Sequence, residues 1–126
     1  MSFRYLTRLA VACSVVLFLI HVATAPFRYD GVSAASLGYA RSAFELIFLS
    51  FFNLAVWQTP PRQAPTRYAM HGANITFLLF SLTYAVHDHG FPAFLVPVVT
   101  AALAISGAGL ELELRRSRWS AGASTL

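Results

Sequence analysis

The sequence is short of charged residues and contains no lysine. Only 11% of its 126 residues are charged, and 57% are apolar. An ordinary soluble domain carries roughly 25% charged residues. A soluble domain of this size has too large a surface to cover with so few charges. The composition therefore excludes an ordinary soluble domain and indicates that the chain hides apolar surface in lipid or in a large assembly.

The sequence also lacks the common signatures of enzymatic sites. The only cysteine, Cys13, lies in an apolar run, which excludes a disulfide framework. The patterns G-x-x-x-x-G-K-[ST], G-x-S-x-G, H-E-x-x-H, C-x-x-C and G-x-G-x-x-G are absent from the sequence. The net charge of +4 comes mainly from the chain ends and one loop, which is typical of a membrane protein and not of a nucleic-acid surface. The sequence therefore assigns no reaction and predicts no nucleic-acid partner.

Four long apolar stretches are present. A helix needs about 20 residues at ~1.5 Å per residue to cross a ~30 Å hydrocarbon layer, and each stretch is close to this length. We predict an all-α integral membrane four-helix bundle that forms a single domain over residues 1–126. The predicted spans are about 5–25, 42–58 (with a start as early as Ser36 also considered), 68–87 and 92–112, followed by a cytoplasmic tail at 113–126.

The connections between these spans differ in length and composition. Residues 58–67 contain three prolines, which cannot continue a helix, and residues 26–41 contain the turn formers Asp30 and Gly31. The third connection is confined to about residues 87–91. We therefore predict that the third and fourth helices form a tight antiparallel hairpin.

The arginines predict the orientation of the chain. Two of the nine, Arg28 and Arg41, lie between the first two spans, whereas the other seven fall at the opposite ends of the helices. The positive-inside rule then predicts a multi-pass protein of the cell inner membrane with both termini in the cytoplasm. The seven are Arg4, Arg8, Arg62, Arg67, Arg115, Arg116 and Arg118, and the aromatic residues expected at the same interface are Trp57, Tyr68 and Trp119.

Residues 1–25 also resemble a secretory signal, with a basic start, an apolar core and Ala23-Thr24-Ala25 at the end. Cleavage there would place Pro26 in the first position after the cut, which signal peptidase tolerates poorly. We therefore expect the first helix to be retained. Its loss would remove His21 and leave three spans.

This threading brings several polar side chains to one outer layer. His21 lies 16 residues beyond Tyr5, or ~24 Å along a helix. Imidazoles with carboxylates are the usual ligands of transition metals, and two histidines on neighbouring helices can hold a haem. The candidate metal ligands are His21, Glu45, His87, Asp88 and His89. In the alternative interpretations, Arg41 and Glu45 form an ion pair at a helix end and the histidines are hydrated, or the layer relays protons or ions.

A second, inner polar layer lies near the cytoplasmic face and contains Asn53, His71 and Asn74. Such side chains mostly form hydrogen bonds between helices, although a pocket or half-pathway that opens inward is an alternative. The fourth span carries small residues four apart, which allow close helix contact with this chain or with another subunit. These pairs are Ala102 with Ser106 and Ala104 with Ala108.

The function expected from these features is that of a small multi-pass inner-membrane protein of unassigned chemistry. We expect an accessory or assembly subunit of a larger membrane complex, or a homo-oligomer, in contact with membrane lipid. One alternative is a metal- or haem-binding membrane protein with a periplasm-side His/Glu/Asp site. Another is a small transporter or channel whose mouths are the two polar layers.

Overall fold

The computed structural model describes residues 2–59, 64–87 and 91–123. These residues form four helices: α1 (Phe3–Arg28), α2 (Ala34–Gln58), α3 (Ala64–His87) and α4 (Phe91–Ala123). Each helix is long and apolar enough to cross a membrane. The prediction of an all-α chain with four helices of membrane-spanning length is therefore confirmed.

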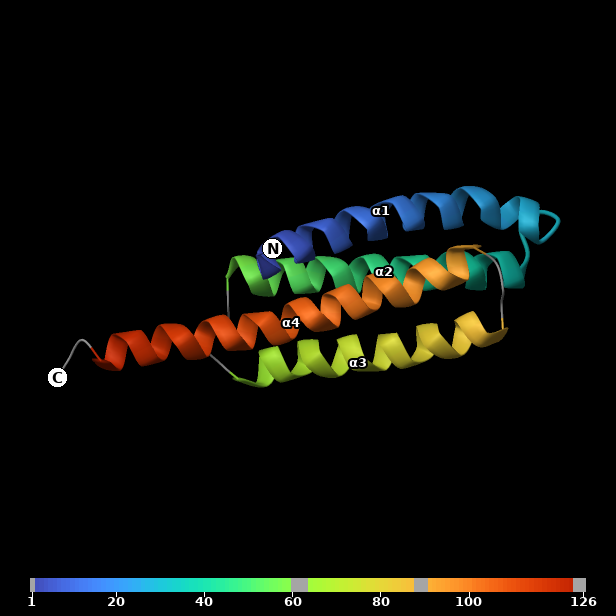
Figure 1. Cartoon of the computed structure of the whole chain (residues 1–126). Coiled ribbons are helices and arrows are strands. Elements are labelled where there is room, and N and C mark those ends of the chain that lie inside the picture. Colours follow the sequence, from blue (N-terminus) through green and yellow to red (C-terminus); the bar gives the residue numbers. More distant parts are fainter. Residues whose placement is uncertain (1, 60–63, 88–90, 124–126) are drawn as a thin grey trace.

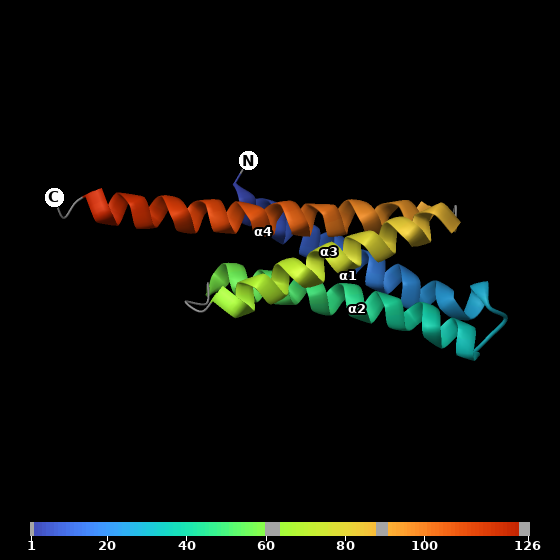
Figure 2. The same cartoon turned by 90° about the horizontal axis from the view of Figure 1, so that it is seen from below.

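The four helices run alternately up and down, so both termini lie at one end of the bundle (Figure 1). We call this the N/C end, and we call the opposite end, which holds Arg28 and Ala34, the distal end. Helix α1 packs along α2 and α4, and α3 packs along α4. Helices α2 and α3 touch over a much shorter stretch, and Figure 2 shows them side by side near the N/C end and apart toward the distal end.

Helix α2 begins earlier than residue 42 because two serines cap it. The Ser33 hydroxyl accepts a hydrogen bond from the Ser36 backbone N–H at 3.1 Å, and the Ser36 hydroxyl accepts one from the Ser33 N–H at 2.8 Å. This reciprocal capping box stabilises a helix start at Ala34. The turn before it contains Asp30 and Gly31, both with positive φ, as expected for these turn-forming residues.

The small residues of α4 allow α1 and α3 to approach its backbone closely. A Cβ atom at Gly109 would overlap the ring of Phe3 in α1, and one at Gly107 would lie 3.1 Å from the Met70 Cε atom in α3. Beside them, Ser106 is fully buried. This part of α4 therefore packs against helices of the same chain.

Four buried polar pairs tie the helices together. Hydrogen bonds between side chains satisfy polar groups that lipid cannot. The pairs are Thr7 with Ser106 at 3.0 Å, Ser14 with Ser50 at 2.6 Å, Ser81 with Thr100 at 3.0 Å, and Asn53 with Asn74 through two bonds of 2.8 and 2.9 Å.

Candidate functional site

A cleft of about 600 Å³ lies between α2 and α3 in the distal half of the bundle. The paired amides of Asn53 and Asn74 hold the two helices together toward the N/C end. Beyond them, Ser81 bonds to Thr100, so α3 follows α4 and leaves α2 (Figure 2). We call this space the α2/α3 cleft. Its lining residues are Leu17, His21, Tyr29, Gly38, Tyr39, Ser42, Ala43, Glu45, Leu46, Thr76, Phe77, Phe80, Ser81, Tyr84 and Val96.

The walls of the cleft toward the middle of the bundle are apolar. Leu46 of α2 and Leu17 of α1 belong to the main hydrophobic core, and Phe77 and Val96 pack against that core. On the α2 side, Gly38 presents no side chain, and a Cβ atom there would meet nothing within 4 Å. An apolar group of a ligand would therefore contact the aliphatic and aromatic carbon atoms of the cleft walls, and no side chain at residue 38 would block it.

The distal end of the cleft is polar and built around Tyr39. The His21 ring stacks on the Tyr39 ring with centroids 4.6 Å apart and planes 22° apart. The Arg28 guanidinium lies 5.2 Å from the centre of the same ring, a cation–π contact. His21 is only 5% exposed, and its Nδ1 atom lies 2.8 Å from the Leu17 carbonyl oxygen. The imidazole is thus fixed in position by a ring contact and a backbone contact.

Glu45 also lines the cleft, but its charge is paired. The Arg41 Nε atom donates to a Glu45 carboxylate oxygen at 2.9 Å, and the two side chains are 80% and 45% exposed. The ion pair considered as one interpretation of the sequence is therefore present, but it lies about two turns inside α2 and not at the helix end. Because Arg41 neutralises Glu45, this carboxylate does not give the cleft a net negative charge.

The predicted metal-ligating residues fall in different surroundings. His21 and Glu45 line one cleft, whereas His87 is exposed at the end of α3 and its Nδ1 atom lies 2.9 Å from the Thr83 carbonyl oxygen. Asp88 and His89 lie outside the described residues. Within the described part of the chain, no three His, Cys, Asp or Glu side chains gather in a way that could hold a metal ion. A metal or haem site therefore stays a prediction that depends on Asp88 and His89.

The inner polar layer is joined across three helices. Besides their mutual bonds, Asn53 donates to the Leu49 carbonyl oxygen at 2.9 Å and Asn74 donates to that of Leu103 at 3.3 Å. Both asparagines are at most 1% exposed. This arrangement supports the interpretation of these two residues as interhelical hydrogen-bonding groups.

A partly buried ion pair lies about two turns nearer the N/C end. The Arg67 Nε atom donates to a Glu111 carboxylate oxygen at 2.8 Å, with side-chain exposures of 8% and 25%. The His71 Nε2 atom lies 3.7 Å from the same oxygen, beyond hydrogen-bonding distance. These groups border a shallower groove of about 480 Å³ lined by His71, Asn74, Ile75, Ala104, Ala108, Glu111, Leu112 and Arg115.

Tyr39 and Gly38 are parts of the site that the sequence analysis did not identify. Both lie within residues 26–41, which were interpreted as a connection. The signal that could have found them is the serine pair Ser33 and Ser36, because a capping box there starts a helix at residue 34. Helical spacing from Leu46 then places Tyr39 on the same face, seven residues earlier.

The subunit and transporter roles expected from the sequence stay predictions. Of the α4 residues that suggested a second subunit, Ser106 bonds to Thr7 of α1 and Ala102 packs against the main hydrophobic core, so this pair is used within the chain. Ala104 and Ala108 line the shallower groove. No family model, curated protein or solved structure matches this chain.

Proposed function

We propose that this protein binds an amphipathic molecule from the lipid bilayer in the α2/α3 cleft. The observation that carries the proposal is the cleft itself, with about 600 Å³ of space, mostly apolar walls and a polar group of residues at one end. Sites for small molecules typically have volumes of about 300–1,000 Å³ and combine apolar walls with a few placed polar groups. The occupant is thus a molecule with a long or bulky apolar part and one small polar part.

The depth of the polar end supports the bilayer as the source of this molecule. His21 lies seven residues before the end of α1 at Arg28, about 10 Å along the helix axis. This depth is near the boundary between hydrocarbon and headgroups if α1 crosses the bilayer. The apolar walls lie deeper, beside Leu46 and Phe77. A lipid-like molecule whose polar part lies at this boundary would contact the polar end of the cleft there and place its apolar part against the deeper apolar walls.

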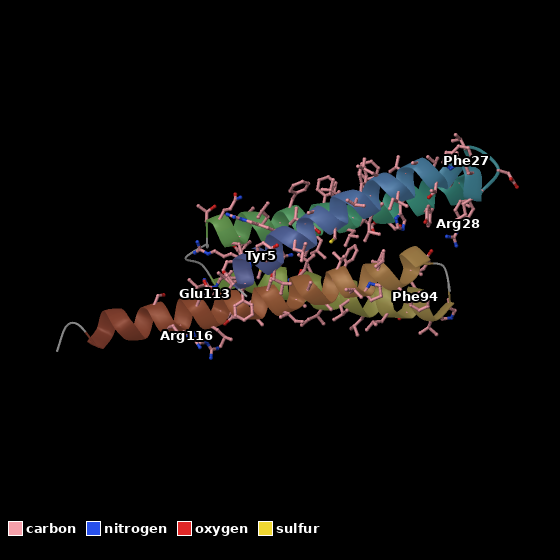
Figure 3. All side chains as sticks on the ribbon, turned by 45° about the horizontal axis from the view of Figure 1, so that its top comes forward. Tyr5, Phe27, Arg28, Phe94, Glu113 and Arg116 are labelled. Atoms are coloured by element: carbon pink, nitrogen blue, oxygen red, sulfur yellow. The ribbon has the colours of Figure 1, made fainter. Side chains whose placement is uncertain are left out.

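The orientation belongs to the same proposal: the distal end faces the periplasm, and both termini lie on the cytoplasmic side of the inner membrane. Arg28, at the end of α1, and Arg41 of α2 lie toward the distal end, whereas the other arginines of the described helices lie toward the N/C end: Arg4, Arg8, Arg67, Arg115, Arg116 and Arg118. Figure 3 shows Arg28 at one end of the molecule and Glu113 and Arg116 toward the other. By the positive-inside rule, a membrane protein with this distribution of arginines has its arginine-rich side in the cytoplasm.

Reporter fusions test this orientation. Alkaline phosphatase fused after Leu126 is expected to be inactive and green fluorescent protein at the same site to be fluorescent, because the C-terminus is cytoplasmic. Insertion of alkaline phosphatase after Gly31, in the connection between α1 and α2, is expected to be active. An active phosphatase at Leu126 would contradict the proposed orientation.

Filling the cleft tests the binding function. Gly38→Trp places an indole ring in the cleft and is expected to lower the amount of co-purifying lipid at least tenfold, since the ring takes the space of the ligand. The measurement is native mass spectrometry of protein extracted in mild detergent and washed, with bound lipids identified after organic extraction.

Two control variants accompany this test. Gly38→Ala adds only a methyl group and is expected to retain the lipid. Gly72→Trp adds the same indole to a glycine of α3 that also has open space around its Cβ position and does not line the cleft. Equal lipid retention by Gly38→Trp and Gly72→Trp would overturn the proposed function.

A further inference from the structure

The contact between His21 and the backbone determines which of the two ring nitrogens carries the hydrogen in the neutral imidazole. Its Nδ1 atom lies 2.8 Å from the Leu17 carbonyl oxygen, and a carbonyl oxygen can only accept a hydrogen bond. Nδ1 therefore carries the hydrogen. In the neutral imidazole, Nε2 then holds a lone pair and acts as an acceptor.

This Nε2 atom has no hydrogen-bond partner within residues 2–59, 64–87 and 91–123. The ring is 5% exposed and lines the α2/α3 cleft. Among the described residues, the fully enclosed polar side-chain atoms without a partner are Trp57 Nε1 and His71 Nε2, so His21 Nε2 keeps some exposed surface at the cleft. A ligand that donates a hydrogen bond to this exposed lone pair gains free energy. The stacked Tyr39 ring and the Leu17 carbonyl hold the imidazole in place, so little side-chain entropy is lost when the ligand binds.

Two other polar side chains of the cleft, those of Ser42 and Glu45, also present acceptors. The Ser42 hydroxyl donates its hydrogen to the Tyr39 carbonyl oxygen at 2.7 Å, which leaves only its lone pairs for a ligand. The Glu45 carboxylate is an acceptor by nature and is already paired with Arg41 at 2.9 Å. The Arg28 guanidinium lies over the Tyr39 ring at this end of the cleft. His21, Ser42 and Glu45 thus offer acceptors to a ligand, and because Arg41 pairs with Glu45 they offer no net negative charge that would attract a cationic amine.

We infer that the α2/α3 cleft selects a neutral lipid with a free hydroxyl group, which donates a hydrogen bond to His21 Nε2. This inference rests on the proposed function and adds the chemical class of its ligand. A lipid whose polar end can only accept hydrogen bonds, such as an ether, an ester or a quinone, leaves His21 Nε2 unpaired and binds more weakly.

A matched pair of probes tests the inference. Tritium-labelled oleyl alcohol and oleyl methyl ether share one chain and differ only in the hydrogen that the alcohol donates. Equilibrium dialysis against the full-length protein in detergent micelles gives both affinities, corrected for partition into empty micelles. We expect the alcohol to bind about five- to tenfold more tightly, the usual effect of one hydrogen bond in a buried site.

The variant His21→Phe keeps a ring on Tyr39 and removes the acceptor. We expect the affinity for the alcohol to fall to that for the ether, with the affinity for the ether unchanged. His87→Phe makes the same substitution at an exposed histidine that does not line the cleft and is expected to change neither affinity. Unchanged ether binding also reports that His21→Phe has preserved the cleft.

The outcomes separate the two proposals. Equal affinities for alcohol and ether in the unmodified protein, both weakened by Gly38→Trp, would overturn the hydroxyl selectivity and leave the binding function standing. If the unmodified protein bound neither probe more tightly than the Gly38→Trp variant does, both the binding function and the hydroxyl selectivity would be overturned. The comparison of alcohol with ether in the unmodified protein requires no variant to fold.

Discussion

Replacing Glu111 with alanine is expected to lower the free energy of unfolding by about 3 kcal/mol. The change leaves Arg67, whose side chain is only 8% exposed, without the carboxylate that lies 2.8 Å from its Nε atom. Breaking a buried ion pair from one side typically costs about 3–5 kcal/mol, and the lower end is expected because a quarter of the Glu111 side chain is exposed and Arg67 keeps another interaction. The measurement is unfolding in mixed micelles with increasing sodium dodecyl sulfate, followed by far-ultraviolet circular dichroism.

A second ion pair in the same chain supplies the control. Arg41 and Glu45 form a contact of 2.9 Å, but their side chains are 80% and 45% exposed. Exposed pairs contribute at most about 1 kcal/mol, so Glu45→Ala is expected to change stability by less than that. The double substitution Arg67→Met with Glu111→Leu removes both charges and is expected to regain most of the lost stability. Equal effects of Glu111→Ala and Glu45→Ala would show that burial does not strengthen the first pair.

The existence of the four helices could be predicted because each apolar stretch is long enough to cross a bilayer. Their ends were harder to predict, because local capping sets them and hydropathy does not. Residues 34–41 are less apolar than the rest of α2, so they were assigned to a connection. The Ser33 and Ser36 side chains nevertheless satisfy backbone groups at the helix start, and the helix therefore begins at Ala34.

The candidate site was predicted in part because depth along a helix follows from residue number, whereas the direction of a side chain does not. The predicted outer layer contained His21, Glu45 and His87 together with Asp88 and His89, which lie outside the described residues. Of these, His21 and Glu45 line the cleft, and His87 is exposed on α3. An additional pattern in α1 could have indicated the direction of His21: Thr7, Ser14 and His21 are polar residues spaced by seven, and all three are buried.

Trp57 illustrates the same limit in the hydrophobic core. The sequence suggested a position at the membrane interface, where tryptophan is common. The structure places it near the N/C end of α2 but buries it to 3% exposure, packed with Val56, Met70 and Leu110. Its place along the helix was thus predictable, whereas its contacts depend on how α2, α3 and α4 are rotated about their axes.

Gly109→Ala and Gly72→Ala are expected to change stability in opposite directions. Alanine in place of glycine inside a helix normally stabilises it by up to about 1 kcal/mol. Gly72 has nothing within 4 Å of its Cβ position, so Gly72→Ala is expected to stabilise the protein. A Cβ atom at Gly109 would overlap the Phe3 ring, and such overpacking costs about 1–3 kcal/mol. The same micelle unfolding measurement should show Gly109→Ala about 2 kcal/mol less stable than Gly72→Ala.

Removing the ring that causes the overlap separates the local effect from any general effect of alanine on α4. In a Phe3→Ala background, Gly109→Ala is expected to lose its cost and to become neutral or stabilising, because the three atoms nearest to the Gly109 Cβ position all belong to the Phe3 ring. The interaction energy from this double-mutant cycle should be about 1–3 kcal/mol in magnitude. A Gly109→Ala variant as stable as Gly72→Ala would instead mean that Phe3 turns away from α4 without loss. In that case the close contact between α1 and α4 at this end would not contribute to the stability of the bundle.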